Sequence, residues 1–156
     1  MAVQGDSQEK TDREVMVFLE FLSKSGFDVC QDSVEKRHPP EPDIRCIHSN
    51  DGPVAFELVE LCDPDVAQIF NRWSPPPVTA AWLGGPDLAK IGAKFNKPYS
   101  TDAPIELLCY TRSRLATPDS VLLPTICHEI DFSRQTTFRR VWYMGELETR
   151  SIYSAR

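Results

Sequence analysis

Hydrophobic and polar residues alternate along this chain with two different periods, and the longer period appears first. Between Thr11 and Gly26, apolar residues recur on one broad helical face, which predicts an amphipathic helix. Thr11 and Glu14 have the spacing of a capping box, and Gly26 would end the helix. Residues 1–10 are mostly polar and predict a flexible tail, so that one domain would cover residues 11–156.

Shorter apolar runs bounded by turn residues predict five strands. We expect these strands at 27–34, 43–48, 54–62, 103–112 and 137–146. An Asp-Gly pair at Asp51 is typical of a hairpin turn between the second strand and the third. Helices are predicted at 66–72, 87–99 and 117–130, while the residues after 146 follow neither period. The order of these elements predicts an α/β domain with a central mixed sheet and helices on both faces.

Composition narrows the classes of function. The chain has 156 residues, of which 41% are hydrophobic and 26% charged, as in an ordinary globular domain. A net charge of −6 argues against a protein whose whole surface binds nucleic acid, but it leaves room for a local basic groove. The five cysteines include no Cys-X-X-Cys pair and predict free thiols in a reducing compartment. No apolar stretch is long enough to span a membrane and the N-terminus does not resemble a secretory signal, so we expect a cytoplasmic protein with no membrane partner.

Two acidic residues on neighbouring predicted strands are the strongest candidates for chemistry. Alternation along the third strand places Glu57 and Val59 on the same face, among apolar residues. A carboxylate buried there is costly unless it is paired or bound to a cation. Asp43 opens the partner strand, and the turn between the strands would let the two carboxylates converge, an arrangement that suits Mg²⁺. The alternative is structural, with Asp43 in a turn and Glu57 paired with an arginine.

The sequence "PD" at Pro42-Asp43, followed by "FELVE" at 56–60 and preceded by a helix with Glu14, resembles the PD-(D/E)XK (restriction-endonuclease-like) superfamily. The resemblance covers residues 11–110 and implies a core of α-β-β-β-α-β order. It implies that Asp43 and Glu57 bind Mg²⁺ or Mn²⁺, with Glu14 assisting. It also implies a nuclease that acts on DNA or RNA, with DNA preferred, and a homodimer or larger assembly for double-strand cleavage.

The family's lysine, two residues after the glutamate, is replaced here by Val59. Lys90 and Lys94 lie four residues apart in a predicted helix and would face the same side, so either could supply the missing charge, with Lys90 preferred. Two other interpretations stay open. The chain could be a catalytically inactive domain of the same fold that serves as an interaction module, or an unrelated α/β domain whose acids are structural.

Basic residues near the predicted site are candidates for phosphate contact. Lys36, Arg37 and His38 lie just before Asp43, where the fold would place them at the mouth of the site. Arg139 and Arg140 form a second basic pair near the last predicted strand, which could extend a nucleic-acid surface. An exposed loop of ordinary surface charge is the alternative for each group.

Overall fold

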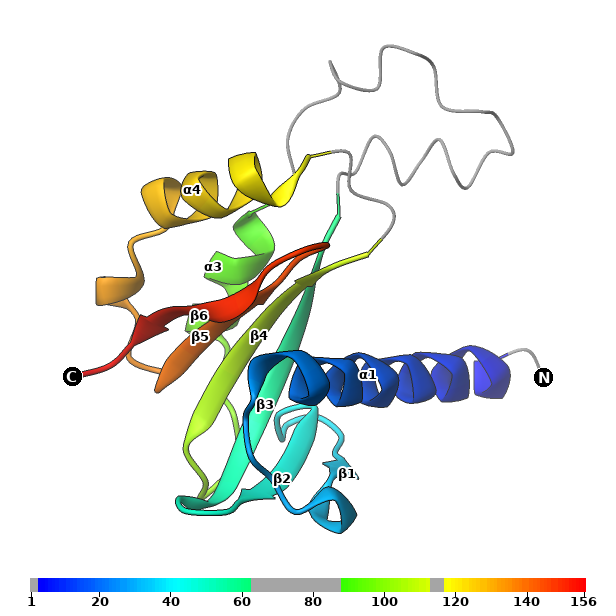
Figure 1. The fold of residues 1–156 in the computed structure, drawn as a ribbon. Helices are drawn as coiled ribbons and strands as arrows, with labels where there is room; N and C mark the ends of the chain where they lie inside the picture. The colour runs from blue at the N-terminus through cyan, green and yellow to red at the C-terminus, as the bar shows by residue number, and fades with distance from the viewer. Residues whose placement is uncertain (1–2, 63–87, 113–116) are drawn as a thin grey trace.

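Six strands form one mixed β-sheet whose order follows the sequence, β1-β2-β3-β4-β5-β6 (Figure 1). The structure is a computed structural model that describes residues 3–62, 88–112 and 117–156. The strands are β1 (Glu35–Lys36), β2 (Ile44–His48), β3 (Gly52–Leu61), β4 (Ile105–Thr111), β5 (Arg140–Met144) and β6 (Thr149–Ser154). The pairs β3–β4 and β4–β5 are parallel, and the other neighbouring pairs are antiparallel. The predicted α/β class with a mixed sheet is therefore confirmed.

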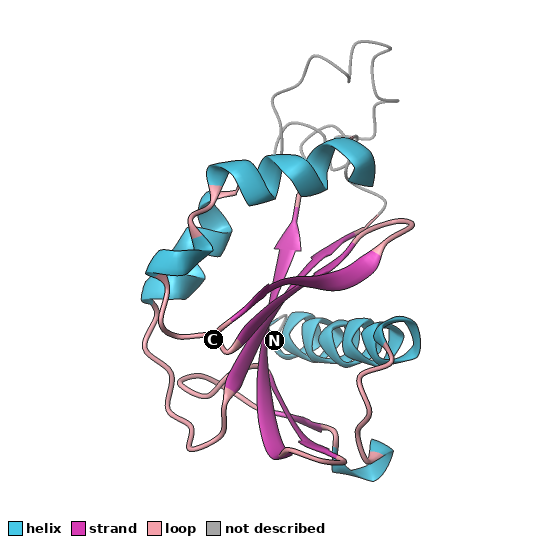
Figure 2. Ribbon diagram, turned by 60° about the vertical axis from the view of Figure 1, so that its left-hand side comes forward, coloured by secondary structure: helices cyan, strands magenta, loops and turns pink. Residues whose placement is uncertain are grey.

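Helices cover both faces of the sheet, as the sequence predicts (Figure 2). The helix α1 (Val3–Ser25) lies on one face, and α3 (Ala89–Asn96) and α4 (Asp119–Glu129) lie on the other. No helix in these ranges combines the length and the apolar character that a bilayer crossing requires.

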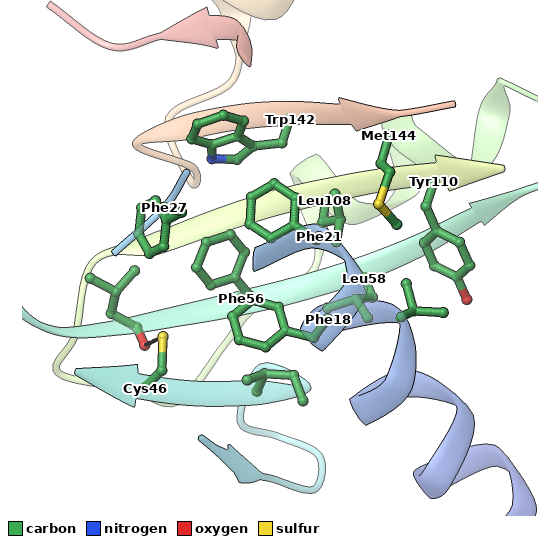
Figure 3. Close-up of a cluster of buried hydrophobic side chains, with 13 residues drawn as sticks. Phe18, Phe21, Phe27, Cys46, Phe56, Leu58, Leu108, Tyr110, Trp142 and Met144 are labelled. Atoms are coloured by element: carbon green, nitrogen blue, oxygen red, sulfur yellow. Dashed lines mark hydrogen bonds between the residues drawn. The ribbon is translucent and has the colours of Figure 1, made fainter. Parts of the chain in front are cut away.

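Side-chain alternation along β3 divides the core into two clusters. Phe56 and Leu58 point toward α1, whereas Val59 points toward α3 and α4. Figure 3 shows the cluster on the α1 face, where Phe18 and Phe21 of the helix pack on aromatic residues of the sheet. The ring centroids of Phe18 and Phe56 are 4.9 Å apart, which anchors α1 across β3.

The start of α1 differs from the prediction. The helix begins at Val3, so the predicted flexible tail over residues 1–10 is wrong from Val3 onward. Thr11 lies inside the helix, where its hydroxyl donates a hydrogen bond to the carbonyl of Ser7 at 2.9 Å, and it is not an N-cap. A threonine can satisfy its hydroxyl in this way within a helix, so the capping-box pattern alone does not locate a helix start.

The predicted first strand, 27–34, is also wrong for most of its length. Only Val29 forms a β-bridge, to His48, and Gln31–Ser33 is a 3-10 turn before the two-residue strand β1. Conversely, β6 occupies the C-terminal residues that follow neither period. The helix predicted at 66–72 lies outside the described residues. The strands predicted at 43–48, 54–62, 103–112 and 137–146 and the helices predicted at 87–99 and 117–130 are present; all have shorter bounds except β3, which begins two residues earlier and ends one residue earlier than predicted.

Candidate metal and phosphate site

A cleft runs along one edge of β3 because β2 is shorter than β3. The pairing of the two strands ends at Ile44 and Phe56, while β3 continues to Leu61 with β4 on its other side. Among the described residues, no strand covers the β3 edge beyond Phe56, and the cleft there has a volume of about 470 Å³. Its walls come from α1, α3 and the segment before β2, and they carry acids and lysines: Lys10, Glu14, Asp43, Glu57, Glu60, Lys90, Lys94 and Lys97.

Asp43 lies immediately before Ile44, the first residue of β2. Its Oδ2 accepts a hydrogen bond from the backbone N–H of Leu58 at 2.9 Å, which fixes the carboxylate beside Glu57. Its Oδ1 accepts a longer bond from Lys36 Nζ at 3.3 Å. Asp43 therefore continues the hydrogen bonding of β3 where the partner strand stops, and it presents one weakly held oxygen to the cleft.

Glu57 is the buried acid of the site, with 1% of its surface exposed. It lies on the α3 face of β3, and its Oε1 accepts hydrogen bonds from Lys94 Nζ at 2.6 Å and Lys97 Nζ at 3.3 Å. Its Oε2 is buried and has no well-aligned hydrogen-bond donor in the described parts of the chain, although the Tyr99 hydroxyl lies next to this carboxylate. A buried carboxylate oxygen without a well-aligned donor costs free energy.

The other two buried acids of the described chain show how a structural carboxylate is satisfied. Glu106 accepts hydrogen bonds from Arg139 and from Trp142 Nε1, the latter at 2.6 Å, and uses both oxygens. Asp119 accepts four hydrogen bonds, from the Tyr143 hydroxyl and from the backbone of the β5–β6 turn. These two carboxylates hold strands and a turn together, whereas Glu57 makes well-aligned hydrogen bonds through Oε1 only.

The helix lysine that reaches Glu57 is Lys94. The preferred candidate, Lys90, lines the cleft but has an exposed side chain and lies one turn earlier, away from the carboxylate. Lys94 has only 25% of its side chain exposed because the second half of α3 lies beside Glu57. Of the two predicted lysines, Lys94 is therefore the one that contacts Glu57, and Lys90 makes no such contact.

Glu14 faces the cleft from α1, as the helical projection predicts. Lys36 Nζ contacts Glu14 Oε2 at 2.5 Å and Asp43 Oδ1 at 3.3 Å, so it bridges the two acids. Burial alone would lower the pKa of Lys36, but the hydrogen bonds and charges of Glu14 and Asp43 outweigh it and raise that pKa. The sequence predicts a phosphate contact for Lys36, with an exposed surface loop as the alternative, but its side chain is mostly buried in this ion-pair network.

Tyr99, just after α3, belongs to the site although the sequence pattern does not indicate it. Its hydroxyl is buried and makes no hydrogen bond of good geometry within the described residues, and its ring lies 5.2 Å from the Lys97 ammonium. Burial raises the pKa of the phenol, as do the negative charges of Glu57 and Asp43 and the interaction of the hydroxyl with the Glu57 carboxylate. The hydroxyl is thus a neutral donor next to the Glu57 carboxylate.

The remaining predicted nucleic-acid contacts do not line the cleft. Arg37 pairs with Glu41 at 2.9 Å, and His38 is exposed. Arg139 pairs with Glu106 at 2.6 Å, and Arg140 stacks on Trp142, on the α1 face of the sheet and not on the Glu57 face. Two of these arginines therefore support the buried Glu106 and Trp142, which a charge pattern read from the sequence does not reveal.

The donor set fits a hard divalent cation through two carboxylates. No group of three or more His, Cys, Asp and Glu side chains that could hold a metal ion occurs in the described ranges. Mg²⁺ is commonly bound through one or two carboxylates and completes its shell with water and phosphate oxygens. Glu57 Oε2 and Asp43 Oδ1, which is held only by the 3.3 Å contact with Lys36, are the oxygens that could serve in that mode. The chain matches no protein-family model, no curated protein and no solved structure.

Proposed function

We propose that this protein is a Mg²⁺- or Mn²⁺-dependent phosphodiesterase that cleaves DNA or RNA in the β3 cleft. The observation that carries the proposal is Glu57. It is a buried acid with one oxygen lacking a well-aligned donor, next to Asp43 and within 2.6 Å of a lysine. Buried groups that remain incompletely satisfied concentrate at functional sites, because stability alone would remove them.

The arrangement of elements supports a restriction-endonuclease-like core. The helix α1 precedes β1, β2 and β3, and α3 then leads into the parallel strand β4, which corresponds to the order α-β-β-β-α-β. Asp43, immediately before β2, and Glu57, in β3, correspond to the two acidic positions of the motif. Val59 stands at the motif's lysine position, and Lys94 would supply the missing ammonium group from α3. A migrated lysine is the feature by which this chain would depart from the family's pattern.

Each side chain has a distinct part in the proposed chemistry. Asp43 and Glu57 would hold the cation, which would lower the pKa of a bound water and neutralise charge on the phosphate. Lys94 donates to the developing negative charge on the phosphate oxygens from a partly buried position, where such an interaction is strong. Glu14 acts through Lys36, which it holds against Asp43 and so fixes that carboxylate's position.

A second candidate is a catalytically inactive domain that binds a protein or nucleic acid. The observation in its favour is that lysines already compensate both carboxylates, Lys36 at Asp43 and Lys94 with Lys97 at Glu57. In such a domain the lysines would neutralise both carboxylates permanently, and a metal ion would not bind them more favourably than the lysines do.

Cleavage of labelled single- and double-stranded DNA and RNA, with Mg²⁺ or Mn²⁺ and with EDTA, tests the proposal. We expect metal-dependent cleavage that falls by at least about a hundredfold in Glu57→Gln, since that change removes a metal ligand. Glu20→Gln is the matched control, because Glu20 is an exposed acid of α1 whose partner is Lys24. A wild-type protein that cleaves none of these substrates with either metal favours the inactive domain.

A further inference from the structure

The charges of the cleft are distributed unevenly between its two sides. In the described chain, two lysines, Lys94 and Lys97, share the single carboxylate of Glu57 on the α3 side. On the α1 side, Lys36 contacts both Glu14 and Asp43, and Lys10 contacts Glu14 at 4.0 Å, so lysines and acids are balanced in these contacts. The α3 side therefore carries an excess positive charge next to the acids. An anion bound in the cleft would lie on that side.

Of the two lysines that contact Glu57, Lys97 is the one available to a ligand. Its contact with Glu57 is 3.3 Å long and 37% of its side chain is exposed, whereas Lys94 makes a contact of 2.6 Å and is less exposed. Both lysines donate to the same oxygen, so Glu57 keeps a short ion pair if Lys97 turns away. An ammonium has three donors, and Lys97 uses one of them here.

Tyr99 gives Lys97 a fixed position. The ammonium lies 5.2 Å from the centroid of the phenol ring, within the range of a cation–π interaction. The ring in turn packs against Phe138 at a centroid distance of 5.9 Å, which anchors it to the core. The Tyr99 ring thus helps to hold the Lys97 side chain at the cleft, so the position of the ammonium does not depend on its contact with Glu57 alone.

We propose that Lys97 binds a backbone phosphate of the nucleic acid, and that Tyr99 positions it for this contact. The inference deepens the proposed function and rests on it for the choice of phosphate as the ligand. Lys94 stays with Glu57, while Lys97 exchanges its long contact for a phosphate oxygen. A phosphate there lies on the side of the cleft with excess positive charge, next to the two acids that would hold the metal.

Fluorescence anisotropy with a labelled single-stranded oligodeoxynucleotide in EDTA tests this contact separately from metal binding and cleavage. We expect Lys97→Ala to weaken binding about five- to tenfold and to lower the slope of log K against log salt by about 0.7, the value for one phosphate contact on a single strand. Lys97→Arg should restore most of the affinity. Lys24→Ala is the control, because Lys24 pairs with an exposed acid and does not line the cleft.

Tyrosine variants test the positioning role. Tyr99→Phe keeps the ring under Lys97 and should bind like the wild type, whereas Tyr99→Leu should bind as weakly as Lys97→Ala. Unfolding curves of each variant establish that the fold is retained. Equal affinity in Tyr99→Leu and Tyr99→Phe overturns the role of the ring.

The outcomes separate this inference from the nuclease proposal. A wild-type protein that does not bind the oligonucleotide, or a Lys97→Ala variant with unchanged affinity and salt slope, overturns the phosphate contact. Equal losses in Lys97→Ala and Lys24→Ala also overturn it, because they indicate general charge attraction. Binding that depends on Lys97 in a protein that never cleaves supports the contact and rejects the nuclease.

Discussion

Replacing Lys94 with methionine tests whether this lysine and a metal ion compete for Glu57. Methionine keeps most of the apolar length of the side chain and removes the charge. In the metal-free protein the change leaves Glu57, which is 1% exposed, with only the 3.3 Å contact to Lys97. In the metal-bound protein the cation would supply the charge that the lysine no longer provides.

The size of the effect follows from burial. Breaking a buried ion pair by removing one partner costs roughly 3–5 kcal/mol. Lys94 retains 25% exposure and Lys97 remains as a partner, so we expect a loss of about 1–2 kcal/mol in EDTA. If the lysine competes with the metal, its removal should tighten metal binding. A tenfold gain in affinity adds about 1.4 kcal/mol at saturating metal, which offsets most of the loss.

Urea unfolding of the wild type and Lys94→Met, with EDTA and with saturating Mg²⁺, measures both quantities. Lys24→Met is the matched control, because Lys24 also makes a 2.6 Å contact with a glutamate, but at the exposed surface of α1. We expect the control to change stability by less than about 0.5 kcal/mol in either condition. A Lys94→Met variant that loses the same stability with and without Mg²⁺ refutes the competition between lysine and metal.

Two further predictions concern the β5–β6 turn. A Cβ on Gly145 would lie 1.9 Å from Asp119 Oδ1, an oxygen that is held in place by its hydrogen bonds. Gly145→Ala should therefore lower the free energy of unfolding in urea by about 2–4 kcal/mol. Gly92 of α3 has open space around it, so the control Gly92→Ala should be neutral or slightly stabilising. Burial alone would raise the pKa of Asp119, but its hydrogen bonds outweigh this effect and lower that pKa. Ionised Asp119 therefore adds to the free energy of unfolding at pH values above the ordinary pKa of about 3.9, and this stabilisation is lost as the pH falls through the lower pKa of the folded state. Unfolding measured from pH 7 to pH 2 should therefore show a smaller acid-induced loss in Asp119→Asn than in the wild type, and equal losses would contradict this role.

Local patterns predict the parts of the fold that depend on a single element or on neighbouring strands. Alternation along β3 gives the correct face for Glu57, and the hairpin at Gly52, with a φ of 77°, brings Asp43 to it because Ile44 pairs with Phe56. The sequence therefore predicts the geometry correctly where strand register and turn type determine it.

Features set by tertiary packing are the ones that the sequence does not predict. The spacing of Lys90 and Lys94 gives their common face, but not how far α3 lies along β3, which depends on the packing of Ile91 in the core. Tyr99 lies after the helix in a segment without a period, so nothing local indicates that its hydroxyl is near two acids. The strand β6 is a half-exposed edge strand whose sequence shows no clear alternation, and only its pairing with β5 defines it.

The most direct test of the central claim is the melting temperature of the protein as Mg²⁺ or Mn²⁺ is added. If Asp43 and Glu57 bind the cation, a concentration of one hundred times Kd stabilises the fold by about 2.7 kcal/mol, which corresponds to a rise of about 5–10 °C for a domain of this size. Asp43→Asn, which keeps an acceptor for the Leu58 N–H, and Glu57→Gln should each abolish the rise. A wild-type melting temperature that does not respond to either metal, or an equal rise in both variants, contradicts a metal site at these two carboxylates.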